Sequence, residues 1–252
     1  MVEGLDHFGR HFADHSGQYI LIGGAACTVA MDAVGRPFRV TKDLDIVLCV
    51  EALDAGFVES FWEFVSLGDY KTQEKASGEK RFYRFKEPAN DGYPFMLELF
   101  SRVPDALTLR DESHLTPIPI DAAVYSLSAI LLEGDYYEFI LSGRQIVGDL
   151  PLVGPAHLIP LKAKAWLDLS QRKADGEQVD SKDIRKHKND VFRLSAIIDP
   201  EFSAEIPRRV TTDLAAFFGQ METEDIPLKN LGLRGQTRDS VLAELRRIYR
   251  TD

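Results

Sequence analysis

The sequence predicts an α+β fold, with a mixed β-sheet and flanking helices over residues 1–150 and a helical region over 151–252. Two observations support this prediction. Short apolar runs bounded by turn residues, such as Tyr19–Ile22 and Leu44–Val50, are typical of buried strands and fall in the first half. After Pro155 the apolar residues recur at helical spacing instead. Strands and helices segregated in this way favour an α+β fold, with an α/β domain over 1–150 and a helical domain over 151–252, over a doubly wound sheet.

The first half alternates between helical and strand-like segments. The strand Tyr19–Ile22 stops at two glycines, and a helix over Ala25–Val34 that Gly35 closes is expected to follow. The turn residues Gly134-Asp135 are expected to separate the last two strands. Further helices are expected over Val2–His15 and Leu53–Leu67, and further strands over Arg81–Phe85, Phe95–Phe100, Ser126–Leu132 and Phe139–Val147.

The second half reads as a series of helices. The first covers Ala156–Arg172, where Pro160 is tolerated because it falls near the first turn. The polar stretch Arg172–Ser181 predicts a mobile loop. The remaining helices are expected over Lys182–Ile198, Phe202–Phe218 and Thr237–Arg250.

Composition indicates an ordinary globular protein with no membrane partner. The 252 residues are 44% hydrophobic and 28% charged. No apolar run reaches the ~18 residues of a membrane span, and Met1–Arg10 lacks the pattern of a signal peptide. The expected location is therefore the cytoplasm. Cys27 and Cys49 lie in apolar stretches and read as buried small hydrophobes.

The net charge of −10 argues against broad, nonspecific binding to nucleic-acid phosphates. A local basic surface is nevertheless expected in the second half. It consists of Lys182, Arg185, Lys186, Lys188 and Arg193.

An Asp-x-Asp pair stands at the start of the second apolar strand. Residues two apart in a strand point to the same side, so Asp43 and Asp45 share one face while Leu44 and Ile46 enter the core. Two carboxylates about 7 Å apart along a strand can converge on one hard cation. Mg²⁺ prefers oxygen ligands and completes its shell with phosphates and water. Asp43 and Asp45 are therefore candidate metal ligands.

Two further features accompany this pair. Gly23-Gly24 stands where a strand turns into a helix, and open backbone N–H groups at a helix N-terminus suit a phosphate. Alone, the glycines would indicate only a tight turn. Glu98 is the only charge in the apolar run FMLELF, so it needs a cation, a donor or a raised pKa. A shared metal would meet that need; the alternative is an edge-strand glutamate that faces solvent.

This order of elements resembles the nucleotidyltransferase superfamily, the polymerase-beta-like fold. The resemblance is closest to the AbiEii/AbiGii toxin type, whose pattern runs Gly-Gly-x-Ala and then Arg-x-Thr/Ser-x-Asp-hydrophobic-Asp. Gly23–Ala26 fits the first part and Arg39–Asp45 fits the second. The match covers residues 19–50 well and the rest of the chain loosely.

The resemblance implies Mg²⁺-dependent transfer of a nucleoside monophosphate from an NTP to an acceptor, with pyrophosphate leaving. Asp43, Asp45 and Glu98 would hold the metal, and Glu98 could instead activate the acceptor. The residues implied to contact the nucleotide phosphates are Gly23, Gly24, Arg39, Thr41 and Lys42.

The resemblance also implies two catalytic residues in the second half. Leu161–Trp166 is similar to a family helix whose lysine neutralises triphosphate charge, which assigns that role to Lys162; the alternative is a snorkelling side chain. A family segment with paired aspartates aligns with Lys188–Arg193, where Asp190 matches the first aspartate and Arg193 replaces the second. Asp183 is the competing match.

Other functions stay open at this level. An aspartyl-nucleophile phosphatase is disfavoured because its apolar strand precedes the aspartates, whereas here the apolar run follows them. A catalytically inactive nucleotidyltransferase-like module that binds a nucleotide or a protein is the main alternative. The acceptor could be tRNA, a protein hydroxyl or a small molecule such as an aminoglycoside. A toxin role with an antitoxin partner follows only by analogy.

Overall fold

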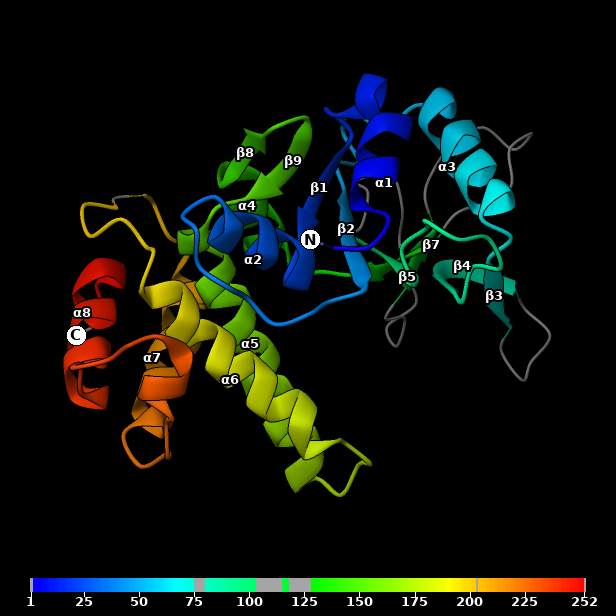
Figure 1. Cartoon of the computed structure of the whole chain (residues 1–252). Helices are drawn as coiled ribbons and strands as arrows, with labels where there is room; N and C mark the ends of the chain where they lie inside the picture. Colours follow the sequence, from blue (N-terminus) through cyan, green and yellow to red (C-terminus); the bar gives the residue numbers. More distant parts are fainter. Residues whose placement is uncertain (1, 75–79, 103–114, 118–127, 203, 252) are drawn as a thin grey trace. The chain divides into compact units, whose positions relative to one another are not determined.

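A computed structural model describes residues 2–74, 80–102, 115–117, 128–202 and 204–251 (Figure 1). The chain divides into two compact units, Met1–Val153 and Gly154–Asp252. The first holds a mixed sheet with helices and the second holds helices, so the predicted α+β class is confirmed. None of the helices in the described ranges has the length and apolar character needed to cross a bilayer.

The first unit is built on one mixed sheet, which has nine strands in the described residues. Its main path runs β3-β4-β5-β2-β1-β9-β8, and β7 pairs with both β5 and β6. The β2–β5, β1–β9 and β5–β7 pairs are parallel, and the others are antiparallel. The strands are β1 Tyr19–Ile22, β2 Asp43–Leu48, β3 Lys71–Glu74, β4 Lys80–Lys86, β5 Met96–Ser101, β6 Leu115–Pro117, β7 Ser128–Leu131, β8 Arg144–Val147 and β9 Leu150–Val153.

Aromatic side chains pack α1 against α3 in the first unit. Phe8 lies in α1 and Phe12 directly follows this helix. Both rings contact Phe64 of α3, and all three side chains are fully buried. Asp54 caps α3 by accepting a hydrogen bond from the Phe57 amide at 2.9 Å. The helices are α1 Leu5–His11, the 3₁₀ turn η1 Ala13–His15, α2 Gly23–Asp32, α3 Ala55–Leu67 and α4 Gly134–Ser142.

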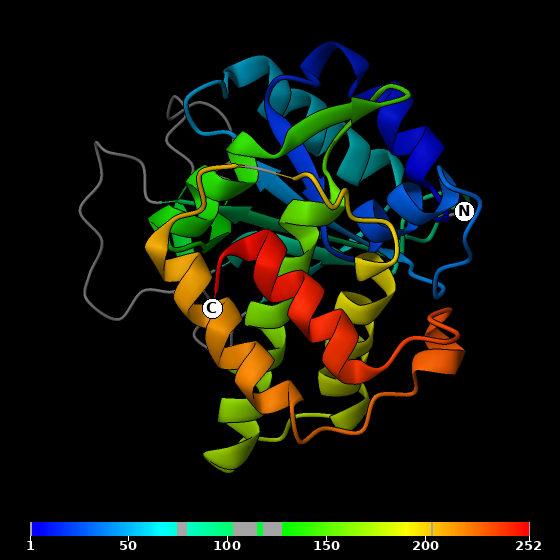
Figure 2. The same cartoon turned by 90° about the vertical axis from the view of Figure 1, so that its left-hand side faces the viewer.

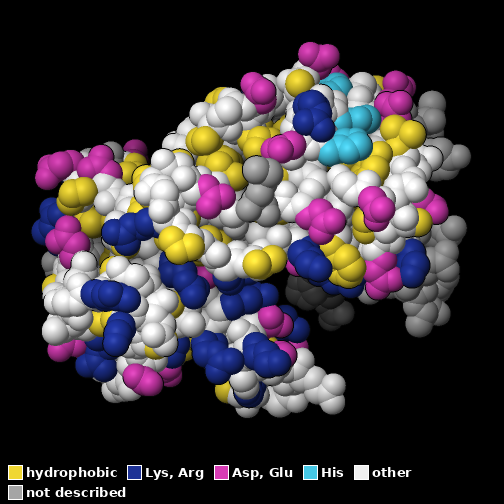
Figure 3. Space-filling model, viewed as in Figure 1, with side chains coloured by type: hydrophobic (Ala, Val, Ile, Leu, Met, Phe, Trp, Pro, Cys, Tyr) yellow, Lys and Arg dark blue, Asp and Glu magenta, His cyan; other side chains and the backbone are white. Residues whose placement is uncertain are grey.

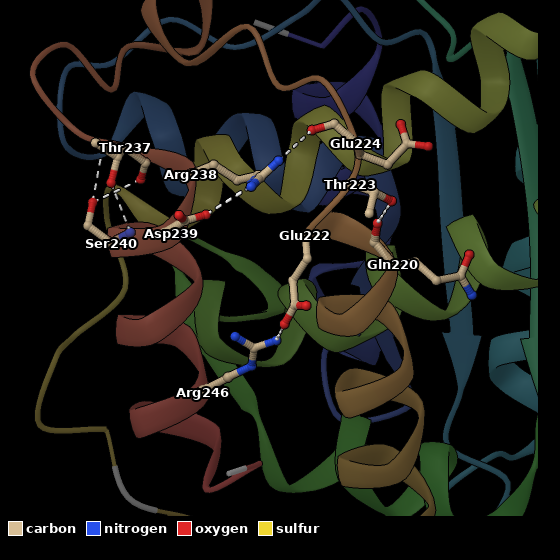
Figure 4. Close-up of polar contacts among 9 residues, drawn as sticks. All are labelled: Gln220, Glu222, Thr223, Glu224, Thr237, Arg238, Asp239, Ser240 and Arg246. Atoms are coloured by element: carbon tan, nitrogen blue, oxygen red, sulfur yellow. Dashed lines mark hydrogen bonds and ion pairs between the residues drawn. The ribbon is translucent and has the colours of Figure 1, made fainter.

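The second unit packs its helices around α5, which contacts α6 and α7 (Figure 2). Helix α8 begins with a capping box in which Thr237 and Ser240 satisfy each other's backbone amides (Figure 4). Arg246 of α8 pairs with Glu222, which follows α7. The helices are α5 Pro155–Ala174, α6 Ser181–Ser195, α7 Arg208–Met221, the 3₁₀ turn η2 Leu228–Leu231 and α8 Arg238–Tyr249.

Helix α5 contains Pro160 beyond its first turn, at a buried position. Proline has no N–H, so the carbonyl of Ala156 four residues earlier lacks its helical donor. The hydroxyl of Tyr249 in α8, which is fully buried, donates to that carbonyl at 2.6 Å. The Tyr249 hydroxyl therefore replaces the hydrogen bond to the Ala156 carbonyl that Pro160 cannot donate.

Three predicted elements were wrong in part. The strand expected over Phe139–Val147 is helical up to Ser142, and Gly134-Asp135 begins that helix. A short apolar run does not by itself separate a strand from a buried helix. Helix α7 begins at Arg208 rather than Phe202, because the proline at its N-cap disfavours helix before it. Helix α5 continues to Ala174, which shortens the expected loop.

Candidate functional site

The Asp-x-Asp pair lies on β2, between β1 and β5. Leu44 and Ile46 are fully buried, whereas Asp43 and Asp45 are half-buried, as alternation along a strand requires. Asp45 is in register with Ile22 of β1 on one side and with Glu98 of β5 on the other. In-register residues of neighbouring strands point to the same face. The sheet therefore brings Asp43, Asp45 and Glu98 to one face.

Gly23 is the first residue of α2 and lies directly against Asp45. Its φ is +67°, a left-handed conformation that favours glycine. A Cβ at this position would lie 2.6 Å from the Asp45 Cγ. A side chain at residue 23 would therefore push the Asp45 carboxylate away from the start of α2. The N-cap residue Ile22 provides no side-chain cap to this helix end, and the Asp45 carboxylate lies beside it.

Thr41 and Arg39 lie over the next residue of α2. A Cβ on Gly24 would be 2.7 Å from the Thr41 hydroxyl and 3.4 Å from a terminal nitrogen of Arg39. The Arg39 guanidinium also lies 5.4 Å from the Phe38 ring centroid. The Thr41 hydroxyl and the Arg39 guanidinium thus lie beside the first turn of α2. Donors in this arrangement suit phosphate oxygens.

Lys42 has an exposed side chain at the start of β2. Its carbonyl accepts a hydrogen bond from the Phe95 amide at 2.9 Å, which ties the strand entry to the segment before β5. Of the five residues implied to contact phosphate, Gly23, Gly24, Arg39 and Thr41 therefore lie together.

Glu98 has a partner that the sequence did not reveal. Arg84 of β4 is in register with Glu98 and forms an ion pair with it. Glu98 is 9% exposed. Burial raises its pKa, the Arg84 charge lowers it, and the Asp45 charge raises it, with a net increase. The charged alternation of β4 could have suggested a cation here, but only the strand register identifies which residue provides it.

The carboxylates have the oxygen donors that Mg²⁺ prefers. Within the described residues, no three acidic, histidine or cysteine side chains are arranged as a complete metal cage. Mg²⁺ commonly takes only one or two protein carboxylates and fills its shell with substrate phosphates and water. Asp43 and Asp45 have the oxygen donors for that role, and Glu98 contacts Arg84.

Lys162 and Asp190 are neighbours in the second unit. The Lys162 ammonium lies 3.8 Å from one Asp190 carboxylate oxygen, and Arg193 lies 3.3 Å from the other. Asp190 is fully buried and Lys162 is 4% exposed, so this pair lies inside the helical unit. The competing Asp183 is exposed and pairs with Lys186 at 2.8 Å. The burial and contacts of Asp190 distinguish it from Asp183.

The predicted basic surface is only partly available to a ligand. Lys188 is buried and contacts both Glu224 at 2.6 Å and the Asp225 carbonyl at 3.0 Å. Lys186 and Arg193 also contact carboxylates. Lys182 and Arg185 are exposed at the start of α6.

No family model matches the chain, and no curated protein matches it. One similar solved structure is an antigenic nucleotidyltransferase-like protein from Paracoccidioides brasiliensis, at 17% identity and a TM-score of 0.46, covering 96% of this chain and 94% of that chain. Another is the Megavirus polyadenylate synthase, at 10% identity and a TM-score of 0.39, covering 88% of this chain and 36% of that chain. Both identities are below 20% and both TM-scores are below 0.5, so neither likeness assigns a function to this chain.

Proposed function

We propose that the chain is a Mg²⁺-dependent nucleotidyltransferase that moves a nucleoside monophosphate from an NTP to an acceptor. The observation that carries the proposal is the contact between Asp45 and Gly23. It puts a strand carboxylate against a helix N-terminus whose N-cap side chain, Ile22, provides no cap. An anion-binding helix end beside a candidate metal ligand suits a metal-bound triphosphate better than either feature does alone.

Each group near this contact has a role in binding the nucleotide. Asp43 and Asp45 would hold Mg²⁺, which when bound supplies charge neutralisation across the phosphates. The backbone amides of Gly23 and Gly24 and the hydroxyl of Thr41 would donate hydrogen bonds to phosphate oxygens. Gly23 and Gly24 begin α2 directly after β1, and Thr41 lies two residues before β2, so the paired strands β1 and β2 hold these donors in place.

The remaining residues would assist the transfer itself. The acceptor oxygen forms a bond to the α-phosphorus, the bond to pyrophosphate breaks, and the acceptor proton passes to a base. Glu98, whose pKa is raised, is the candidate base or else a further metal ligand. Arg39 and Lys42 would offset the charge of the leaving pyrophosphate. The family resemblance also assigns catalytic roles to Lys162 and Asp190, and the two side chains form a buried ion pair in the second unit.

We further propose that the activity is of the AbiEii/AbiGii toxin type, with tRNA or a protein as acceptor and an antitoxin protein as partner. Support comes from the motif segments Gly23–Ala26 and Arg39–Asp45. The exposed Lys182 and Arg185 would contact a polyanionic acceptor.

Calorimetry with each of the four NTPs, with and without Mg²⁺, tests the proposal. The key variant is Asp43→Asn/Asp45→Asn, which keeps side-chain size but removes two charges. The matched control is Glu59→Gln/Glu63→Gln, which removes two charges from exposed positions of α3 in the same unit. We expect Mg²⁺-dependent binding of at least one NTP by wild type and the control, and its loss in the aspartate variant.

Transfer is then measured with an NTP labelled at the α-phosphate and candidate acceptors. Label that stays on tRNA or protein, and that disappears with the aspartate variant, supports the enzyme. Mg²⁺-dependent binding without transfer to any acceptor would favour the inactive binding module. Absence of NTP binding by folded wild type would contradict the proposed site.

A further inference from the structure

A groove opens on the first unit, between α1, the C-terminal end of α2 and the turn that joins β8 to β9. Its volume is about 600 Å³, within the range of sites that bind ligands or side chains. Its floor is apolar and is formed by Val2, Leu5, Val29, Val147 and Leu150. Figure 3 shows hydrophobic side chains gathered in this region with acidic side chains around them.

The rim of the groove is acidic on all three sides. Asp6 of α1, Asp32 of α2 and Asp149 of the β8–β9 turn line it, and all three are exposed. None of these carboxylates forms an ion pair with another part of the chain that the structure describes. Arg10 is the single cation among the described lining residues. With three carboxylates against one guanidinium, the lining of the groove keeps a net negative charge.

The charge of the whole unit acts in the same direction. Residues 1–153 contain 13 Lys and Arg against 24 Asp and Glu, a net charge of −11. Residues 154–252 contain 17 Lys and Arg against 16 Asp and Glu, a net charge of +1. The negative charge of the chain thus belongs to the unit that carries the groove, and its field attracts cationic partners.

We propose that this groove binds a basic amphipathic segment of a partner protein. Apolar side chains of the segment enter the floor, and Lys or Arg side chains beside them meet Asp6, Asp32 and Asp149. A segment of this kind combines both features, because a helix or strand presents apolar and charged side chains at fixed spacing. The acidic rim disfavours nucleic acids and anionic lipid surfaces, which carry the same sign of charge.

The test uses the full chain and a fluorescein-labelled 14-residue Leu/Lys peptide with helical apolar spacing, followed by fluorescence anisotropy. The first variant is Asp6→Asn/Asp32→Asn/Asp149→Asn, and its control, Glu59→Gln/Glu63→Gln/Glu138→Gln, removes the same charge from exposed positions elsewhere in the unit. A second pair is Ala33→Arg, which adds bulk and positive charge at the groove edge, and Ala33→Ser, which adds neither.

We expect the rim variant to weaken peptide binding about tenfold, because it removes three exposed ion pairs with the peptide. The control variant should weaken binding by less than about twofold. Ala33→Arg should weaken binding similarly while Ala33→Ser does not, and an equivalent Leu/Glu peptide should not bind. No binding of the Leu/Lys peptide, or equal weakening by rim and control variants, overturns the proposal. Two other results would also overturn it. One is self-association of the chain that Ala33→Arg abolishes, and the other is an uncharged apolar dye that competes with the peptide and binds the rim variant as tightly as wild type.

Discussion

The contact between Tyr249 and Ala156 gives a prediction whose size follows from the structure. In Tyr249→Phe the ring stays in place but the carbonyl of Ala156 loses its donor, because Pro160 provides no N–H. The site is fully buried, so water cannot replace the hydroxyl without opening the helices. Leaving a buried carbonyl without a donor costs about 1–3 kcal/mol, and we expect the free energy of unfolding to fall by that amount.

A double-mutant cycle separates this cause from general damage. Pro160→Ala restores the N–H that Ala156 lacks, so in that background Tyr249→Phe should cost about 1–2 kcal/mol less. Ile248→Val is the control, because it removes a buried methyl beside Tyr249 and should cost the same in both backgrounds. Urea unfolding followed by far-UV circular dichroism measures all six proteins. If Tyr249→Phe lowers the free energy of unfolding equally with and without Pro160, the hydroxyl does not replace the hydrogen bond that Pro160 lacks.

Three further substitutions test other parts of the structure. Gly23→Ala should destabilise the chain by about 2 kcal/mol and abolish NTP binding, whereas Gly35→Ala, at the same φ of +67° with open space around it, should show only the backbone strain in thermal unfolding. Arg84→Met should cost about 3 kcal/mol in urea unfolding because it leaves Glu98 buried without its pair; Arg84→Met/Glu98→Met should regain most of this, and no recovery would contradict the pairing. Burial lowers the pKa of His157 from 6.5 to about 4, so the unfolded state binds its proton first as the pH falls. Up to about 3 kcal/mol of stability should be lost between pH 6.5 and pH 4, and His157→Gln should flatten that slope in unfolding measured across this range.

The local spacing of apolar and turn residues predicted the strands and helices of the site better than it predicted which residues contact one another. The strand Tyr19–Ile22 was predicted with its correct ends, because four apolar residues stand between polar residues and two glycines. Asp43 belongs to β2 although the prediction began one residue later, because its backbone pairs with Met96 of β5. Such pairing depends on register between distant segments, which no local periodicity encodes. For the same reason the sequence could mark Glu98 as needing a partner but could not identify it.

The electrostatics at the start of α2 make a last prediction about why a divalent cation is needed. A helix N-terminus carries about half a positive charge, yet the Asp45 carboxylate already lies against its first residue. An incoming phosphate therefore meets a carboxylate as well as the helix end, and the two anions repel unless a cation lies between them. Wild type should consequently bind pyrophosphate weakly without Mg²⁺ and more tightly with it.

Asp45→Asn removes the repulsion and the metal ligand together, so its two effects have opposite signs. We expect calorimetry to show tighter pyrophosphate binding than wild type without Mg²⁺, by about 1 kcal/mol, and no gain when Mg²⁺ is added. Asp43 lies two residues before Asp45 on β2 and farther from Gly23. Asp43→Asn should therefore lose the Mg²⁺-dependent increase in pyrophosphate affinity, and its affinity without Mg²⁺ should rise by less than that of Asp45→Asn. If Asp45→Asn weakens binding equally with and without Mg²⁺, the carboxylate supports the fold of this turn rather than a metal-bound phosphate.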